Sequence, residues 1–169
     1  MAHDDEFTRI AYHECGHVIM AEYLGGQTDL LTIAPDSDPD DLPERSGEFR
    51  VLWINDDGAS DKDIALREIK IALAGPVAEM IYDGTQFTPD FLEEWRHDWQ
   101  MATERAKAYL PKTTPISEHL GRTIYEIIEF FERDHIWAAL ASLADALEAH
   151  ETLEPDDIAE VLEAWPIQA

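Results

Sequence analysis

Two histidines four residues apart, with a glutamate directly after the first, constrain this chain more than any other feature. They lie in residues 11–24, which read Ala-Tyr-His-Glu-Cys-Gly-His-Val-Ile-Met-Ala-Glu-Tyr-Leu. An α-helix has about 3.6 residues per turn, so His13 and His17 lie nearly one above the other and both imidazoles can reach the same ion. Glu14 borders this face, which also carries three apolar residues, Ile10, Met20 and Leu24. The pattern predicts a mostly buried helix whose ionisable face turns inward.

This helix has two interpretations, a plain core element and a metal site. A neutral imidazole can lie in a core with two hydrogen bonds. Two histidines and a carboxylate on one buried face would, without a metal, leave several polar groups to satisfy at about 1–3 kcal/mol each. A zinc ion accepts both imidazole lone pairs. Since His13, Glu14 and His17 also form the His-Glu-x-x-His pattern of helical zinc hydrolases, the zinc interpretation is favoured.

Length and charge limit the classes of partner. At 169 residues the sequence predicts a single domain, residues 1–169, with a net charge of −25 that disfavours nucleic acid and anionic membrane surfaces. No uncharged apolar run approaches the ~20 residues of a membrane span, and the acidic start differs from a signal peptide. The one cysteine, Cys15, excludes an internal disulfide and is expected to be a small buried apolar residue. We therefore expect a cytoplasmic protein.

Hydrophobic periodicity and turn residues predict the order of elements. Strands are expected at residues 30–33 and 48–54, joined by an acidic, proline-containing loop at residues 36–47. Helices are expected from about residue 7 to 24, 60 to 82, 88 to 110, 116 to 147 and 156 to 164, the fourth being either one helix or two joined near Asp134. Pro76 should kink or split the second helix, because proline removes a backbone donor. The expected fold is mainly helical α+β, with a small sheet beside the motif helix.

A catalytic zinc site needs a third protein ligand, and the third helix supplies the best candidate. One stripe at helical spacing contains Phe91, Trp95, Asp98, Ala102 and Tyr109. Asp98 is therefore the carboxylate most expected to point inward. Glu94 and His97 flank the stripe and are the fallback candidates. The alternative is that Asp98 is a solvated or salt-bridged surface acid.

The sequence resembles the protease domain of the FtsH-type ATP-dependent zinc peptidases along nearly its whole length. The segments that carry the resemblance are residues 11–18, 31–35, 73–79, 97–103 and 151–154. The first resembles the family's motif helix, and the fourth, His-Asp-Trp-Gln-Met-Ala-Thr, matches its Asn-Asp-x-x-x-Ala-Thr segment. The aspartate of that segment is the family's third zinc ligand, a role that maps onto Asp98. The resemblance implies an FtsH-protease-like fold that binds Zn²⁺ through His13, His17 and Asp98.

The sequence also departs from the family. The ATPase module and membrane segments that precede the family's protease domain are not in this sequence, and none of its eight glycines begins a Gly-Lys-Ser/Thr phosphate loop. Pro76 replaces an arginine and His97 an asparagine, and the loop at residues 36–47 also differs. Any ATP-driven delivery of substrate would thus need a separate ATPase or another protein partner.

The resemblance implies a mechanism with defined roles. Zinc lowers the pKa of a bound water to roughly 7, and Glu14, rotated by about 100° from His13, accepts its proton. Glu79 either orients a ligating imidazole from outside the ligand set or is a plain surface residue. Two functions remain open: a zinc endopeptidase acting on peptides or unfolded proteins, and a non-catalytic zinc-containing module that binds a protein partner. Glu14 favours the endopeptidase, since a structural site gains nothing from a general base.

Overall fold

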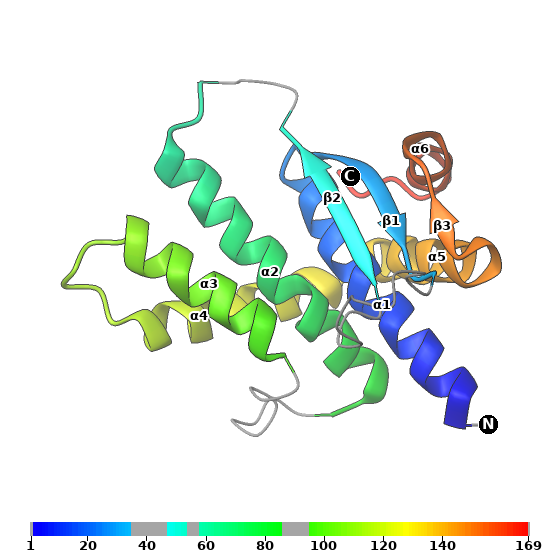
Figure 1. Ribbon diagram of the computed structural model, residues 1–169, viewed down its shortest axis with the longest axis horizontal. Coiled ribbons are helices and arrows are strands. Elements are labelled where there is room, and N and C mark those ends of the chain that lie inside the picture. The colour runs from blue at the N-terminus through cyan, green and yellow to red at the C-terminus, as the bar shows by residue number, and fades with distance from the viewer. Residues whose placement is uncertain (1, 35–46, 54–57, 86–94, 169) are drawn as a thin grey trace, which may run out of the picture.

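The computed structural model describes residues 2–34, 47–53, 58–85 and 95–168, and Figure 1 shows how their helices and strands are arranged. The elements follow one another as α1 (Ala2–Tyr23), β1 (Gln27–Thr32), β2 (Glu48–Leu52), α2 (Asp61–Asp83), α3 (Arg96–Tyr109), α4 (Ile116–Phe131), α5 (Asp134–His150), β3 (Thr152–Leu153) and α6 (Pro155–Ala164). The mainly helical α+β prediction with a small sheet is confirmed. The small sheet lies on one side of α1 and α2, and α3 and α4 lie on the other side of α2 (Figure 1).

The two long helices α1 and α2 pack closely against each other and form the centre of the structure. Gly16 marks a close approach of the two helices, because a Cβ atom built there would lie 2.6 Å from Cβ of Ala78 and 2.7 Å from the carbonyl oxygen of Ala74. Cys15 is fully buried beside this contact, as predicted. This packing places one face of α1 against the middle of α2.

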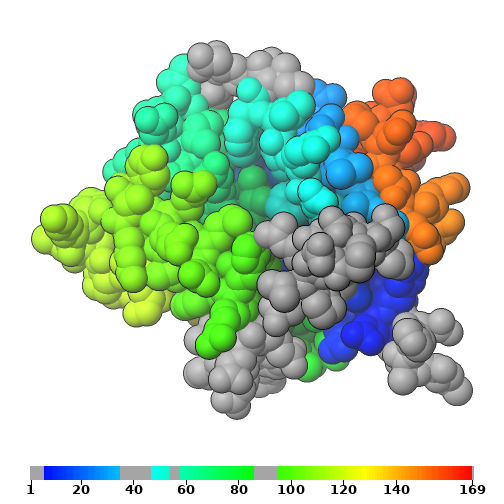
Figure 2. All heavy atoms as spheres, in the orientation of Figure 1, coloured from blue at the N-terminus to red at the C-terminus, as the bar shows by residue number. Residues whose placement is uncertain are grey.

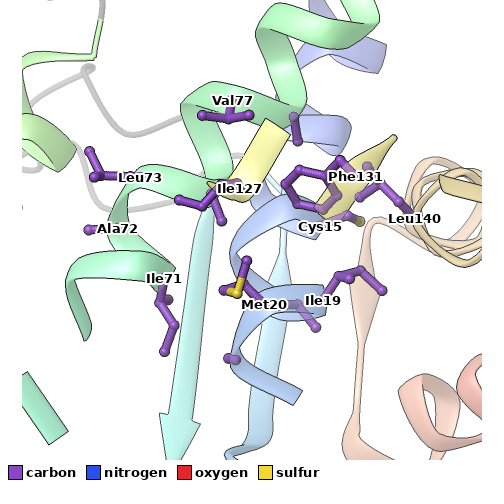
Figure 3. Packing of buried hydrophobic residues seen from close by; sticks show 14 of the residues in the cluster. Cys15, Ile19, Met20, Ile71, Ala72, Leu73, Val77, Ile127, Phe131 and Leu140 are labelled. Atoms are coloured by element: carbon purple, nitrogen blue, oxygen red, sulfur yellow. The ribbon is translucent and has the colours of Figure 1, made fainter. Parts of the chain in front are cut away.

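The core extends from this helix pair to α4 and α5. Figure 3 shows Ile19 and Met20 of α1, Val77 of α2, Ile127 of α4 and Leu140 of α5 converging. An apolar stripe runs along residues 116–147, and its buried members are Ile124, Ile127, Phe131, Ile136, Leu140, Leu143 and Leu147. The stripe belongs to two helices, since α4 ends at Phe131 and α5 begins at Asp134.

The sheet has three antiparallel strands in the order β2-β1-β3, so β2 lies at its edge. Phe49 pairs with Leu31, and Leu31 pairs on its other side with Leu153. Along β2 the exposed residues alternate with half-buried ones, and the half-buried Phe49 and Val51 pack against the core. The pair β1–β2 was expected, whereas the two-residue β3 was not, because it is too short to show a periodic pattern.

Several boundaries differ from the sequence prediction. Helix α1 begins at Ala2, earlier than the expected start near residue 7. Strand β1 begins at Gln27, and β2 ends at Leu52. Tyr109, predicted to be on the inward stripe of α3, is 37% exposed because it is the last residue of the helix.

Of the two outcomes predicted for Pro76, a kink or a split, the split of the second helix is wrong. Helix α2 runs without interruption through Pro76, which is buried together with its neighbours Ala74, Gly75 and Val77. Packing on several sides holds this segment helical although proline removes one hydrogen bond. None of the helices in the described ranges is long and apolar enough to cross a membrane.

Candidate metal centre

The histidine pair lies beyond the first turns of α1 (Ala2–Tyr23), on the side that packs against α2. The side chain of His17 is 2% exposed and that of His13 17% exposed, and Glu14 counts among the buried polar residues. Their two rings meet edge to face with centroids 4.8 Å apart. The imidazoles therefore lie side by side in the interior, as the four-residue spacing predicts.

Helix α3 brings a carboxylate to the same point. Oδ2 of Asp98 lies 2.9 Å from Nε2 of His13 and 3.6 Å from Nε2 of His17. One ligand atom from each of the three residues lies within 4.8 Å of the others, so the cluster could hold a metal ion. Asp98 is 81 positions after His17 in the sequence, and only the packing of α3 against α2 joins them.

The second nitrogen of each imidazole already has a hydrogen-bond acceptor. Nδ1 of His13 lies 2.7 Å from Oε2 of Glu79, and Nδ1 of His17 lies 2.6 Å from the carbonyl oxygen of Ile71. Both acceptors belong to α2. A proton on each Nδ1 leaves the two Nε2 atoms facing Asp98 as the metal-binding atoms, which is the usual arrangement of ligating histidines.

The site is strongly suited to a cation. Burial opposes protonation of His13, but the hydrogen bonds with Asp98 and Glu79 outweigh it and raise the pKa of His13 to about 10. Burial likewise opposes ionisation of Asp98, yet the charges and hydrogen bonds of His17 and His13 hold the pKa of that carboxyl well below its usual range. Two carboxylates thus stabilise positive charge at this point, whether a proton or a metal ion supplies it.

Glu79 has further contacts besides its hydrogen bond with His13. The indole nitrogen of Trp95 donates to its Oε2 atom over 3.0 Å, and Nε of Arg9 lies 3.7 Å from Oε1. The Glu79 side chain is 15% exposed. Trp95 was expected on the inward stripe, but its bond to Glu79 and the Ile71 carbonyl were not identified from the sequence. No local pattern marks them, because they depend on how the helices pack.

A cleft of about 560 Å³ opens over the cluster. Figure 2 shows the hollow between β2 and α3. The cleft is lined by Ile10, His13, Glu14 and His17 of α1, by Gly47 and Glu48 with Phe49, Val51 and Trp53, by Glu68, Ile71, Ala72 and Glu79 of α2, and by Trp95, His97, Asp98, Met101 and Arg105. Glu14 is packed tightly there, since a Cβ atom on Gly47 would lie 2.5 Å from its Cγ.

The structure places most of the predicted site residues in or beside one cluster. His13, His17 and Asp98 meet, Glu14 lines the cleft beside them, and Glu79 contacts His13. His97 lines the cleft but is not part of the three-residue cluster. The other fallback ligand, Glu94, lies outside the described residues. The roles of these side chains in catalysis remain predictions.

Comparison with known proteins adds no relative. No model of a known protein family matches the chain, and no curated protein matches it either. The relation to the FtsH-type peptidases therefore remains a prediction.

Replacing Glu79 with alanine should weaken metal binding by about 10–100-fold, as expected when the acceptor behind a ligating histidine is lost. The reason is that Nδ1 of His13 would lose its 2.7 Å partner and the ring its fixed orientation. Competition with a chromophoric chelator measures the affinity. Asp83→Ala is the control, because Asp83 pairs with the same Arg9 but is not a partner of His13. An equal loss of metal affinity in both variants would show that the negative charge of α2 matters, and not the contact of Glu79 with His13.

Proposed function

We propose that this protein is a zinc-dependent endopeptidase that hydrolyses peptides or unfolded proteins without an ATPase of its own. The observation that carries the proposal is the meeting of Nε2 of His13, Nε2 of His17 and Oδ2 of Asp98, with both Nδ1 atoms bonded to α2. Two imidazole nitrogens and one carboxylate oxygen are a typical donor set for a catalytic zinc that keeps a fourth position open. The donor set thus fits the group that the motif implies.

Each residue has a task in this proposal. His13, His17 and Asp98 would hold the zinc, which when bound lowers the pKa of a water and polarises a carbonyl group. Glu14, one residue after His13 on the cleft side of α1, accepts the proton of the attacking water and passes it to the leaving amine. Glu79 keeps His13 oriented through Nδ1. Burial of Glu14 against Gly47 limits the positions that its carboxylate can adopt.

The form of the cleft supports a peptide as the substrate. Its wall includes β2, which is an edge strand. Among the described strands, β2 pairs with β1 on one side and has no partner on the other. Such an edge can pair with an extended peptide through backbone hydrogen bonds. The half-buried Phe49 and Val51 of β2, together with Met101 of α3, give the cleft apolar surface for side chains. Only an extended chain can present its backbone in this way, which favours peptides and unfolded proteins over folded ones.

The test is metal analysis combined with cleavage of an unfolded protein. The purified chain should bind one zinc ion, hydrolyse a fluorescently labelled unfolded protein, and lose this activity when a chelator removes the metal. His13→Ala should lose both zinc and hydrolysis, because it removes a ligand and the partner of Glu79.

The outcomes separate the two functions that the sequence leaves open. Zinc binding without hydrolysis of any of a broad set of unfolded substrates would overturn the endopeptidase and favour the protein-binding module. A metal-replete chain without bound zinc would refute both.

A further inference from the structure

A glycine in the interior of α2 lies against the ring of His17. Glycine in the middle of a helix is less favourable than alanine by about 1 kcal/mol, so its presence at position 75 of a buried helix has to be compensated by packing. Gly75 lies near the middle of α2 (Asp61–Asp83), directly before Pro76, and is itself buried. The reason for glycine therefore lies in what its missing side chain leaves room for.

The missing side chain leaves room for an imidazole. A Cβ atom built on Gly75 would lie 2.3 Å from Nε2, 2.5 Å from Cε1 and 2.8 Å from Cδ2 of His17. A point this close to all three ring atoms lies over the face of the ring, since a point in the ring plane beyond its edge could not be so near to all three. These distances are far inside van der Waals contact, so any larger residue at position 75 must displace the imidazole. The first atom to be displaced is Nε2, which faces Asp98.

The turn of α2 that contains Gly75 also restricts the rotation of the His17 ring. The carbonyl oxygen of Ile71, four residues before Gly75, lies 2.6 Å from Nδ1 of His17. Phe49 of β2 stacks on the ring with centroids 4.5 Å apart and an interplanar angle of 15°. The side chain of His17 is only 2% exposed. Ile71, Gly75 and Phe49 thus form a slot for this one side chain, which we call the His17 slot.

We propose that Gly75 is a positioning residue, which places Nε2 of His17 for metal binding by leaving the His17 slot open. The metal-binding part rests on the proposed zinc function, whereas the slot is a property of the chain alone. A different role for a glycine is seen at Gly16, where the added Cβ would meet Ala78 and a backbone oxygen of α2. Gly16 serves the approach of two helices, whereas the three atoms nearest to a Cβ built on Gly75 all belong to one imidazole.

A double-mutant cycle tests the slot without metal or substrate. Unfolding midpoints are measured with a chelator present for Gly75→Ala, His17→Ala and the double variant. Gly75→Ala alone should lower the midpoint by about 4–10 °C, as expected for an overpacked core. With His17 replaced by alanine the clash is removed, and the same change should raise the midpoint by about 2–4 °C through helix propensity. The sign of the effect thus depends on His17.

The control is Gly121→Ala in α4, where an added Cβ meets no atom within 4 Å. This substitution should raise the midpoint by about 2–4 °C in both the wild-type and the His17→Ala chain. If Gly75→Ala alone does not fold but the double variant does, the slot is supported by the same logic. A similar loss from Gly75→Ala in both backgrounds would overturn the proposal, because the clash would then be with α1 itself.

Zinc affinity tests the positioning role separately from hydrolysis. In competition with a chromophoric chelator, Gly75→Ala should bind zinc about 10–100-fold more weakly, comparable to the loss of an outer contact of a ligand. Gly121→Ala should bind it as the wild type does. Wild-type affinity in folded Gly75→Ala would overturn the positioning role. Failure of the endopeptidase proposal would instead appear as absent hydrolysis or absent zinc in the wild-type chain, with the thermal cycle unchanged.

Discussion

Replacing Glu14 with glutamine should lower the rate of peptide hydrolysis by at least about 100-fold while the chain still binds zinc, because a general base contributes about 10²–10⁴-fold. Glutamine has nearly the shape of glutamate, so it fits the buried space beside Gly47, where an added Cβ would lie only 2.5 Å from Cγ of Glu14. Its amide cannot take a proton from water. The three metal-binding residues are untouched, so the metal should remain.

Two measurements on the same preparation decide this prediction, zinc content and initial rate on a labelled unfolded protein. Glu48→Gln is the matched control, since Glu48 is an exposed carboxylate that lines the same cleft on β2. Equal activity of Glu14→Gln and wild type would refute the proposed mechanism. An equal loss in both variants would mean that the negative charge of the cleft matters, not a proton transfer by Glu14.

The parts of the site that lie on one helix were predictable from the sequence. The spacing of His13 and His17 is sufficient to place both imidazoles on one face, because an α-helix fixes that geometry locally. Asp98 was predictable in a weaker sense. Its position on an apolar stripe suggests that it points inward, but its distance of 2.9 Å to His13 results from the packing of α3 against α2.

What the sequence did not predict are contacts between elements. The Ile71 carbonyl contacts His17, and the Trp95 indole contacts Glu79. Every residue has such a carbonyl and every tryptophan such an indole, so the sequence does not mark these two contacts. The continuity of α2 through Pro76 was not decided by the sequence, since local rules allow either a kink or a split and burial on several sides holds the helix. Gly75 is an intermediate case. A glycine inside a helix signals a close contact, but the sequence does not show that the contact is His17.

The second large effect is expected at Asp98. Asp98→Ala removes the carboxylate that faces both Nε2 atoms, at 2.9 Å from His13 and 3.6 Å from His17. Zinc affinity should fall by more than about 100-fold, which exceeds the effect of losing an outer contact such as Glu79. The fall should appear in chelator competition.

A second measurement follows from the electrostatics of the metal-free chain. The hydrogen bond from His13 to Asp98 is one of the contributions that raise the pKa of His13 to about 10, together with Glu79 and against burial. Without Asp98, less remains to offset the effect of burial, which opposes protonation of His13, so the pKa of His13 should fall. An NMR titration of the imidazole signals measures this directly. It shows whether the substitution has acted at the histidines, independently of zinc.

The controls for Asp98 test the placement of α3. Glu104→Ala removes an exposed carboxylate from the same helix and should leave zinc affinity unchanged. His97→Ala removes the neighbouring side chain, which lines the cleft but is outside the three-residue cluster, and should weaken binding far less than Asp98→Ala. If His97→Ala released zinc and Asp98→Ala did not, the orientation of α3, with Asp98 turned towards α1, would be refuted. Because Asp98 meets His13 and His17 only through this packing, the comparison tests the fold and the metal centre together.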